Sequence, residues 1–373
     1  MRIAFLSTFF VGEYGVTRVI AAQMPLLVAA GHSVDLYACF LDQSLVANGV
    51  QAVRVPTHFR GLKKMLQRGS YDVVIACTEQ FFSMVADWKL DAVTIAYEHG
   101  YIPVELTIPA EREGHRKMIE ERVNRIYPSF SHVVTISRYA VDYIRWPQAF
   151  VLHNGADHFV NASVPDFESQ DGFIRILAVS RYRQVEWAGK GMDCFCRLKK
   201  ELGDKVEITI VGGGDETTTA LLVEAGINAL GVVKDPVEMA NVYAQCDVVV
   251  SFSKCEMFNL PLAEAGFAHK PALALNVCAH PEVTPFVFDS YEQIRDFLKE
   301  ASRESLKQAG RQMFDFVDAR FRWETNARKL LKFLEEICPQ SKNGSPSPAF
   351  YLRRYFWIVR EAVRNFAHKV IRR

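Results

Sequence analysis

The chain has 373 residues, of which 49% are hydrophobic and 23% charged, and its formal net charge is +1. This length exceeds one typical domain and suits two domains of roughly 150–200 residues, while the composition excludes an intrinsically disordered chain. No apolar run reaches the ~18 residues that a membrane-spanning helix needs, and the N-terminal MRIAFLSTFF lacks the pattern of a secretory signal. We therefore expect a cytoplasmic protein.

The first half of the chain alternates predicted strands and helices. A helix is predicted over 16–30, because apolar residues recur there at helical spacing and Gly31 follows. A second, highly charged helix is predicted over about 109–127. The apolar runs that we interpret as strands are 3–7, 33–39, 72–77, 92–97 and 132–137. Their continuous apolar character is typical of parallel strands buried on both faces of a sheet.

The second half repeats this pattern, with predicted strands at 174–180, 206–212 and 246–253. Predicted helices fall near 190–201, 235–245, 260–269, 290–302, 303–319 and 323–338. Two such series predict an α/β fold with two doubly wound, Rossmann-like domains. The polar stretch near 155–172 separates an N-terminal domain, 1–157, from a C-terminal domain, 158–338. A linker and a basic tail, 339–373, follow.

Two glutamates follow the strand 246–253, at the edge where open α/β sheets bind ligands. Glu256 lies just outside a predicted helix whose first turn holds Pro261, and Glu264 lies about one turn inside. The backbone amides of 257–260 form an anion site at the start of this helix. One carboxylate then suits a ribose and the other a hexose. The alternative is a pair of ordinary helix glutamates.

Other candidate residues also follow predicted strands. Arg181 and Lys190 come after the strand 174–180 and are natural phosphate ligands, or else solvated cations. Gly15 follows the first strand, where a donor phosphate or an acceptor could approach. His99 ends the strand 92–97 and can bind a sugar hydroxyl or position a leaving group, unless it is merely structural. The Gly212–Gly214 run permits close backbone approach but is weak evidence by itself.

These residues occur in a set of motifs that resembles family 4 of the retaining glycosyltransferases, which have the GT-B fold. The similarity covers about residues 1–335. Its most specific element is the E-x7-E signature from Glu256 to Glu264 within CEMFNLPLAEAGFAHKPALA. Supporting segments occur in the family's order: AGHSVDL (30–36), TIS (135–137), HNGAD (153–157), AVSRYRQVEWAGKGMD (178–193) and HPEV (280–283).

The resemblance implies roles for individual residues. Arg181 and Lys190 would hold the donor diphosphate, Glu264 the ribose and Glu256 the sugar, and His99 would face the reacting centre. Contacts to the donor are also implied for Gly15, Val232, Val233, Phe258, Asn259 and Leu260. The family retains anomeric configuration and uses no metal. It implies a UDP- or GDP-sugar donor of the hexose type, a glycan or lipid-linked acceptor, and a product in surface polysaccharide or glycolipid synthesis.

The sequence departs from the family pattern in its glycine loops. Gly15 is followed by Val16 instead of a second glycine, Ser180 stands where the family has a glycine, and Asn259 replaces another. These changes keep open a catalytically silent relative that binds a partner or a membrane. An epimerase or phosphorylase of the same fold is a further alternative.

The positive charge of the chain is concentrated at its C-terminal end. Residues 342–373 hold eight Lys or Arg and one acid, and 349–371 repeat apolar residues at helical spacing. This composition favours an amphipathic helix on an anionic membrane, with a helix packed on the N-terminal domain as the alternative. No nucleic-acid-reading motif is present, so a nucleic-acid partner is not expected. The eight cysteines lack zinc spacing and are expected to be reduced thiols.

Overall fold

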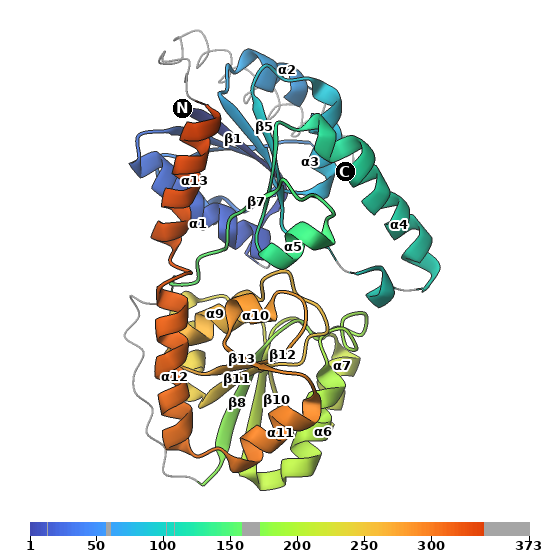
Figure 1. Cartoon of the computed structure of the whole chain (residues 1–373), viewed down its shortest axis with the longest axis vertical. Helices are drawn as coiled ribbons and strands as arrows, with labels where there is room; N and C mark the ends of the chain where they lie inside the picture. The colour runs from blue at the N-terminus through green and yellow to red at the C-terminus, as the bar shows by residue number, and fades with distance from the viewer. Residues whose placement is uncertain (13, 57–60, 102, 108, 159–171, 339–373) are drawn as a thin grey trace, which may run out of the picture. The chain divides into compact units, whose positions relative to one another are not determined.

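The computed structural model describes residues 1–12, 14–56, 61–101, 103–107, 109–158 and 172–338, and these residues form two compact units (Figure 1). Among the described residues, the first unit contains those of Met1–Glu98 and Glu121–Val134 together with 329–338. The second contains His99–Glu120 and Thr135–Arg328. The predicted boundary near 155–172 falls largely outside the described residues, and so do the predicted linker and basic tail, 339–373.

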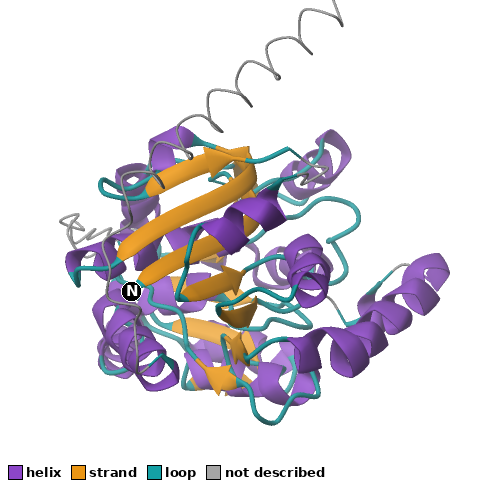
Figure 2. Cartoon of the chain, turned by 90° about the horizontal axis from the view of Figure 1, so that it is seen from above, coloured by secondary structure: helices purple, strands orange, loops and turns teal. Residues whose placement is uncertain are grey.

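The first sheet has seven strands in the order β3-β2-β1-β4-β5-β6-β7, and the four pairs from β3 to β5 are parallel. Its strands are β1 (Arg2–Phe10), β2 (Ser33–Leu41), β3 (Gln51–Arg54), β4 (Val73–Ala76), β5 (Val93–Glu98), β6 (His132–Thr135) and β7 (Phe150–Val151). In the central register Ile3 of β1 pairs with Val34 and with Val73. Figure 2 shows strands in orange lying side by side with helices in purple around them.

The helices in this part of the chain are α1 (Gly15–Ala29), α2 (Leu62–Arg68), α3 (Glu79–Trp88), α4 (Arg112–Glu121) and α5 (Arg138–Tyr143). The predicted helix over 109–127 continues beyond α4 as a π-helical segment, Arg122–Ile126. The side chain of Ser137 caps α5 by accepting a hydrogen bond from the amide of Ala140 at 3.1 Å. This is the preferred way to satisfy a helix N-terminus.

The second sheet has six parallel strands in the order β10-β9-β8-β11-β12-β13. Its strands are β8 (Ile174–Val179), β9 (Val206–Val211), β10 (Asn228–Gly231), β11 (Val248–Ser251), β12 (Ala272–Leu275) and β13 (Phe286–Phe288). The accompanying helices are α6 (Met192–Leu202), α7 (Glu216–Glu224), α8 (Pro236–Gln245), α9 (Leu260–Phe267), α10 (His280–Val283), α11 (Tyr291–Glu300) and α12 (Arg303–Asp318). The last helix, α13 (Trp323–Ile337), begins in the second unit and continues in the first.

Both faces of the second sheet are buried. On one face Ile176, Ile208 and Val250 pack with residues of α6 and α11 in one apolar core. Their strand neighbours Leu177 and Val249 are also buried, and α9 contacts β11 and β12. Burial of successive residues on opposite faces explains why these strands appear as continuous apolar runs. The predicted fold class, two doubly wound parallel sheets with helices, is confirmed.

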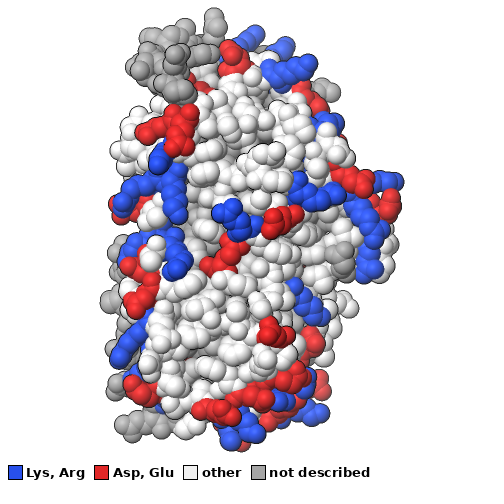
Figure 3. All heavy atoms as spheres, in the orientation of Figure 1, with Lys and Arg blue, Asp and Glu red and all other residues white. Residues whose placement is uncertain are grey.

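Charged side chains of both signs are interspersed on the face drawn in Figure 3. On α6 and α11, for example, Arg197 pairs with Glu201 and Glu292, and Arg295 pairs with Glu201. Exposed pairs of this kind stabilise a fold by only about 0–1 kcal/mol each. Within the described residues, the structure contains no helix that is both long and apolar enough to cross a bilayer.

Candidate functional site

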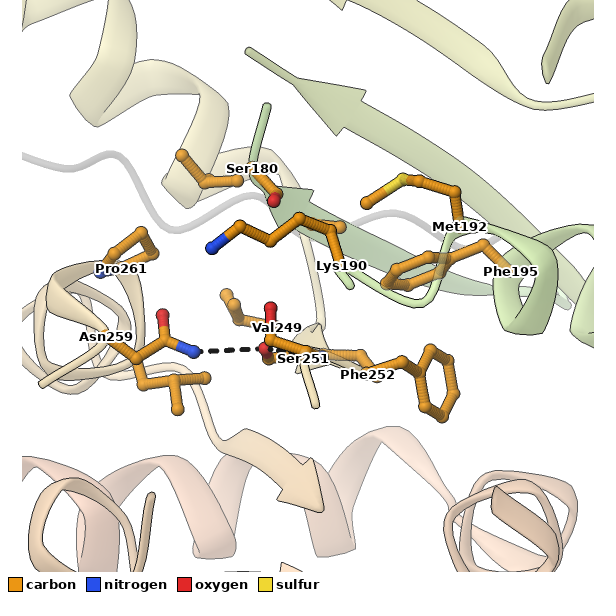
Figure 4. Close-up of a pocket in the computed structure, with 14 residues that line it drawn as sticks. Ser180, Lys190, Met192, Phe195, Val249, Ser251, Phe252, Asn259 and Pro261 are labelled. Carbon is orange, nitrogen blue, oxygen red and sulfur yellow. Dashed lines mark hydrogen bonds between the residues drawn. The ribbon is translucent and has the colours of Figure 1, made fainter. Parts of the chain in front are cut away.

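A hollow lies at the carboxyl ends of β8 and β11 in the second unit (Figure 4). Parallel strands end at the same edge of a sheet, so residues that follow β8 and β11 meet there. The hollow contains about 260 Å³ of space, including the part open to solvent. Its polar lining residues are Ser180, Lys190, Ser251, Ser253 and Asn259.

Lys190 and Glu256 meet in this region, although 66 residues separate them in the chain. The Lys190 Nζ donates to Glu256 Oε1 at 2.5 Å, and about a fifth of each side chain is exposed. Burial tends to raise the pKa of Glu256, but the charge and the hydrogen bond of Lys190 more than offset this and hold the pKa below its ordinary value. Glu256 is therefore ionised near neutral pH and paired with a cation that borders the hollow.

Gly191 allows Lys190 to lie close to β11. It has φ +66°, and a Cβ at this position would collide with the backbone carbonyl of Phe252. Only glycine adopts this conformation without strain and leaves space for that carbonyl. Gly191, which follows Lys190 in the AVSRYRQVEWAGKGMD segment, therefore meets a packing requirement.

We expect Gly191→Ala to destabilise the protein by more than the roughly 1–2 kcal/mol that a left-handed conformation costs a residue with a Cβ. The collision with Phe252 adds to that cost and displaces Lys190. Gly31→Ala is the matched control, because Gly31 has φ +85° at the end of α1 and no atom within 4 Å of an added Cβ. Thermal unfolding of both variants measures the difference. Equal destabilisation by the two substitutions would show that the contact with Phe252 is unimportant.

Asn259 forms the turn into α9. Its φ is +59°, a conformation that asparagine tolerates better than most residues, which explains how it replaces a glycine of the family pattern. Its Nδ2 bonds Ser251 Oγ at 3.0 Å and His280 Nε2 at 2.9 Å. Because His280 Nδ1 lies 2.8 Å from the carbonyl of Leu275, that nitrogen donates and Nε2 accepts. In Figure 4 the Asn259 amide oxygen points away from Ser251, on the side of Lys190.

The start of α9 provides backbone donors beside these side chains. The helix begins at Leu260, has Pro261 in its first turn, and lacks a side-chain cap. The amide of Leu262 already bonds the carbonyl of Asn259 at 3.1 Å. A helix N-terminus without a side-chain cap favours an anion through its amides and its dipole.

Glu264 is placed differently from Glu256. It is 1% exposed, and its Oε2 accepts a hydrogen bond from the Tyr243 hydroxyl at 2.6 Å. Its Oε1 lies 3.2 Å from His158 Nε2. The carboxylate predicted to bind a ribose therefore contacts two protein side chains in this structure. Tyr243 and His158 were absent from the sequence prediction, because nothing in their spacing indicates that α8 and the segment after HNGAD reach α9.

Arg181, Val232 and Val233, which were predicted to contact the donor, lie farther along the same sheet edge. Arg181 is half exposed, and its Nε bonds Glu186 at 2.9 Å. A Cβ on Gly212, which has φ +148°, would collide with the carbonyl of Ser180, so these two loops are in contact. Val232 lies beside Gly213 in the loop after β10, while Val233 is half-buried.

Neither Phe258 nor Gly15 is among the residues that line the hollow. The Phe258 ring is buried and packs against Phe321 at 5.2 Å and His153 at 6.2 Å, so only its backbone is available to a ligand. Gly15 is the first residue of α1 and belongs to the first unit.

Glu282, in the HPEV segment, has a positioning role. Its carboxylate accepts the amides of Arg138 and Tyr139, both at 2.7 Å, and lies 2.9 Å from His153 Nε2. Burial tends to raise the pKa of Glu282, but these hydrogen bonds lower it below its ordinary value. Glu282 thus joins the start of α5 to the HNGAD segment within the second unit.

His99 follows β5 directly, and both of its ring nitrogens are buried. Burial lowers the pKa of His99 to about 3. The backbone of its neighbour Gly100 packs against the side chain of Met257, the residue after Glu256, so closely that a Cβ on Gly100 would collide with it. His99 is therefore a neutral imidazole near physiological pH.

The lowered pKa of His99 predicts a pH effect on stability. The unfolded histidine takes up a proton near its ordinary pKa of 6.5, whereas the folded one does so only near 3. Its stabilising contribution is therefore complete above pH 6.5 and is lost as the pH falls through that value toward 3. We expect the melting temperature of His99→Gln to fall less steeply than that of the wild type between pH 7.5 and pH 5. If the melting temperatures of the variant and the wild type fall equally with pH, the predicted effect of burying His99 is contradicted.

Two family profiles match the chain. Residues 14–158 match "Glycosyltransferase Family 4", and residues 174–302 match "Glycosyl transferases group 1". No curated relative matches the chain at a significant level.

Several solved structures share the fold. HepE from Anabaena, in complex with UDP and glucose, has a TM-score of 0.74 and 15% identity, covering 90% of this chain and 100% of its own. Sucrose-phosphate synthase from Thermosynechococcus elongatus has a TM-score of 0.72 and 17% identity, covering 91% and 100%. The lipopolysaccharide outer core galactosyltransferase WaaB, in its apo form, has a TM-score of 0.65 and 13% identity, covering 89% and 99%.

Proposed function

Because the chain belongs to the family 4, group 1 glycosyltransferases of the GT-B fold, we propose that it moves a hexose-type sugar from a nucleotide-sugar donor to a glycan or lipid-linked acceptor, retaining anomeric configuration. The observation that carries the proposal is the Lys190–Glu256 pair beside the start of α9. It combines a cation and helix amides for a diphosphate with a carboxylate for a sugar hydroxyl.

The proposed reaction breaks the bond between the anomeric carbon and the donor diphosphate. The acceptor hydroxyl attacks from the same face, and its proton passes to the departing phosphate oxygen. Lys190 and the α9 amides stabilise the negative charge that develops on the diphosphate. Such stabilisation by fixed hydrogen-bond donors is usually the largest single contribution to the rate enhancement. Arg181 supplies a second cation once it leaves Glu186, so the proposal assigns this work to protein groups and not to a metal ion.

Glu256 receives the role of positioning the donor sugar. Its ionised carboxylate accepts hydrogen bonds from sugar hydroxyls, and Lys190 keeps it ionised. Glu264 is proposed to bind the ribose, which requires it to exchange its contacts with Tyr243 and His158 for the donor. His99 acts in the proposal as a neutral hydrogen-bonding group at the reacting centre.

The donor is proposed to be a UDP-sugar. This assignment rests on the HepE structures, which contain UDP, UDP-glucose, or UDP and glucose. Surface polysaccharide or glycolipid synthesis is proposed because WaaB, a structure of the same fold, acts on the lipopolysaccharide outer core. We also propose that the protein binds peripherally to the cytoplasmic membrane, on the basis of the composition of residues 349–373 alone.

A thermal-shift screen tests the proposal directly. A donor that binds the folded chain at 100 times its Kd stabilises it by about 2.7 kcal/mol. We expect UDP-glucose or UDP-galactose to raise the melting temperature more than ADP-glucose, GDP-mannose or CMP-sialic acid. If no nucleotide sugar raises the melting temperature and none is turned over, the catalytically silent alternative is favoured. The observation that supports this alternative is the enclosed carboxylate of Glu264.

A further inference from the structure

Two cysteines lie together beside Glu256. The thiols of Cys255 and Cys278 lie close enough to interact, and the Tyr139 hydroxyl also interacts with the Cys278 thiol. Cys255 immediately precedes Glu256, and Cys278 lies in the loop between β12 and α10. All these residues belong to the second unit. Twenty-three positions separate the two cysteines in the chain, so the loops bring them together.

Contacts of the residues on both sides of Cys255 hold its loop next to the loop that carries Cys278. The Glu256 carbonyl accepts the amide of Ala279 at 3.1 Å, and the Lys254 carbonyl lies 3.8 Å from Cys278 Sγ. Hydrogen-bonded backbone segments run about 5 Å apart. A disulfide spans Cα atoms roughly 4.4–6.8 Å apart, so this pairing of loops is compatible with one.

The two sulfurs differ in their chemistry. The hydrogen bond from Cys255, helped by Tyr139, lowers the pKa of Cys278 to about 6, while burial acts in the opposite direction. The pKa of Cys255 is raised, first by its hydrogen bond to Cys278 and then by burial. Burial also raises the pKa of the other six thiols: Cys39, Cys77, Cys194, Cys196, Cys246 and Cys338. A thiolate with a neighbouring thiol is the arrangement found in redox-sensitive cysteine pairs.

We propose that Cys255 and Cys278 form a redox-sensitive dithiol beside Glu256, which a hydroperoxide converts into a disulfide. The Cys278 thiolate attacks one peroxide oxygen, the O–O bond breaks, and the released hydroxide takes up a proton to become water. The Cys278 sulfur is thereby oxidised to a sulfenic acid. The Cys255 sulfur then attacks it, the S–O bond breaks, and the hydroxide leaves as water with the thiol proton. Two thiols and one hydrogen peroxide give one disulfide and two waters.

The disulfide joins the loop that carries Glu256 to the loop before α10. Glu256 is paired with Lys190 through a short contact, so a shift of its backbone disturbs that pair. Because misplacing a catalytic group by about 1 Å can cost up to ~100-fold in rate, we expect oxidation to lower donor turnover at least about tenfold, reversibly with dithiothreitol. This consequence rests on the proposed function, whereas formation of the disulfide does not.

Peptide mapping of the full-length chain treated with hydrogen peroxide tests the proposal. A protease that cleaves after glutamate releases Cys255 on the peptide 239–256 and Cys278 on 265–282. We expect these two peptides to be linked without reductant and separate after dithiothreitol. Absence of the linked species in the oxidised wild type overturns the proposal, and this measurement requires no variant to fold.

Three variants identify the sulfurs involved. Cys278→Ser should abolish the linkage, and Cys255→Ser should abolish it while leaving a sulfenic acid on Cys278 that dimedone captures. Cys255→Ser also excludes Cys246, which lies on the same peptide but is buried. Cys194→Ser, a substitution on α6, should leave the linkage intact. A linkage that persists without Cys278 would refute the assignment.

Discussion

Lys190→Ala is expected to lower donor turnover by roughly 100- to 1,000-fold, the usual effect of removing one fixed donor that stabilises a developing negative charge. Lys190 borders the hollow at the ends of β8 and β11, and its Nζ contacts Glu256 at 2.5 Å. The substitution removes the cation from the proposed diphosphate site and also the group that lowers the pKa of Glu256. Measurement of UDP release with the donor identified by thermal shift gives the change in kcat and KM.

Lys254→Ala is the matched control for this substitution. Lys254 is an exposed lysine two residues before Glu256, so its removal changes the charge of the same loop without changing the hollow. We expect Lys254→Ala to keep turnover near the wild-type rate and Lys190→Arg to recover only part of it, because a planar guanidinium does not replace a compact ammonium. Normal turnover by folded Lys190→Ala would refute the role of Lys190.

The sequence predicted most of the inner strands of both sheets but none of the four edge strands. The apolar runs that became β1, β2, β4, β5, β6, β8, β9 and β11 were predicted, since strands buried on both faces are largely apolar. The strands β3, β7, β10, β12 and β13 were missed. They are two to four residues long, and in β10 exposed residues alternate with less exposed ones. Such short segments lack the pattern by which a strand is identified.

The candidate site was predictable in part. Lys190 and Glu256 were both named from their places after two strands, and the parallel topology brings them together. The enclosure of Glu264 was not predictable, because it depends on Tyr243, 21 residues earlier, and on His158. The Asn259–His280 contact likewise joins two loops whose relative placement follows from the packing of the whole sheet edge. Spacing along the chain contains no information on either contact.

Arg122→Ala is expected to destabilise the protein by about 3–5 kcal/mol, the cost of removing one partner from a buried ion pair. Arg122 is 4% exposed in its side chain, and its Nη1 donates to Glu98 Oε2 at 2.7 Å. Glu98 is 3% exposed and also accepts the Tyr127 hydroxyl at 2.9 Å. Without Arg122 the Glu98 carboxylate stays buried but loses that cation. Chemical denaturation should show the loss as a lower midpoint.

Arg125→Ala tests whether the burial of the Arg122–Glu98 pair is the reason for its large expected effect on stability. Arg125 lies one turn later and pairs with Asp87 and Glu121, but these side chains are 42–68% exposed. Exposed pairs contribute about 0–1 kcal/mol, so this variant should unfold near the wild-type midpoint. Glu98→Gln combined with Arg122→Met removes both charges and should restore much of the stability. Because Glu98 directly precedes His99, Arg122→Ala should also lower turnover in the protein that remains folded. Equal stability of the Arg122→Ala and Arg125→Ala variants would contradict the role of the buried pair.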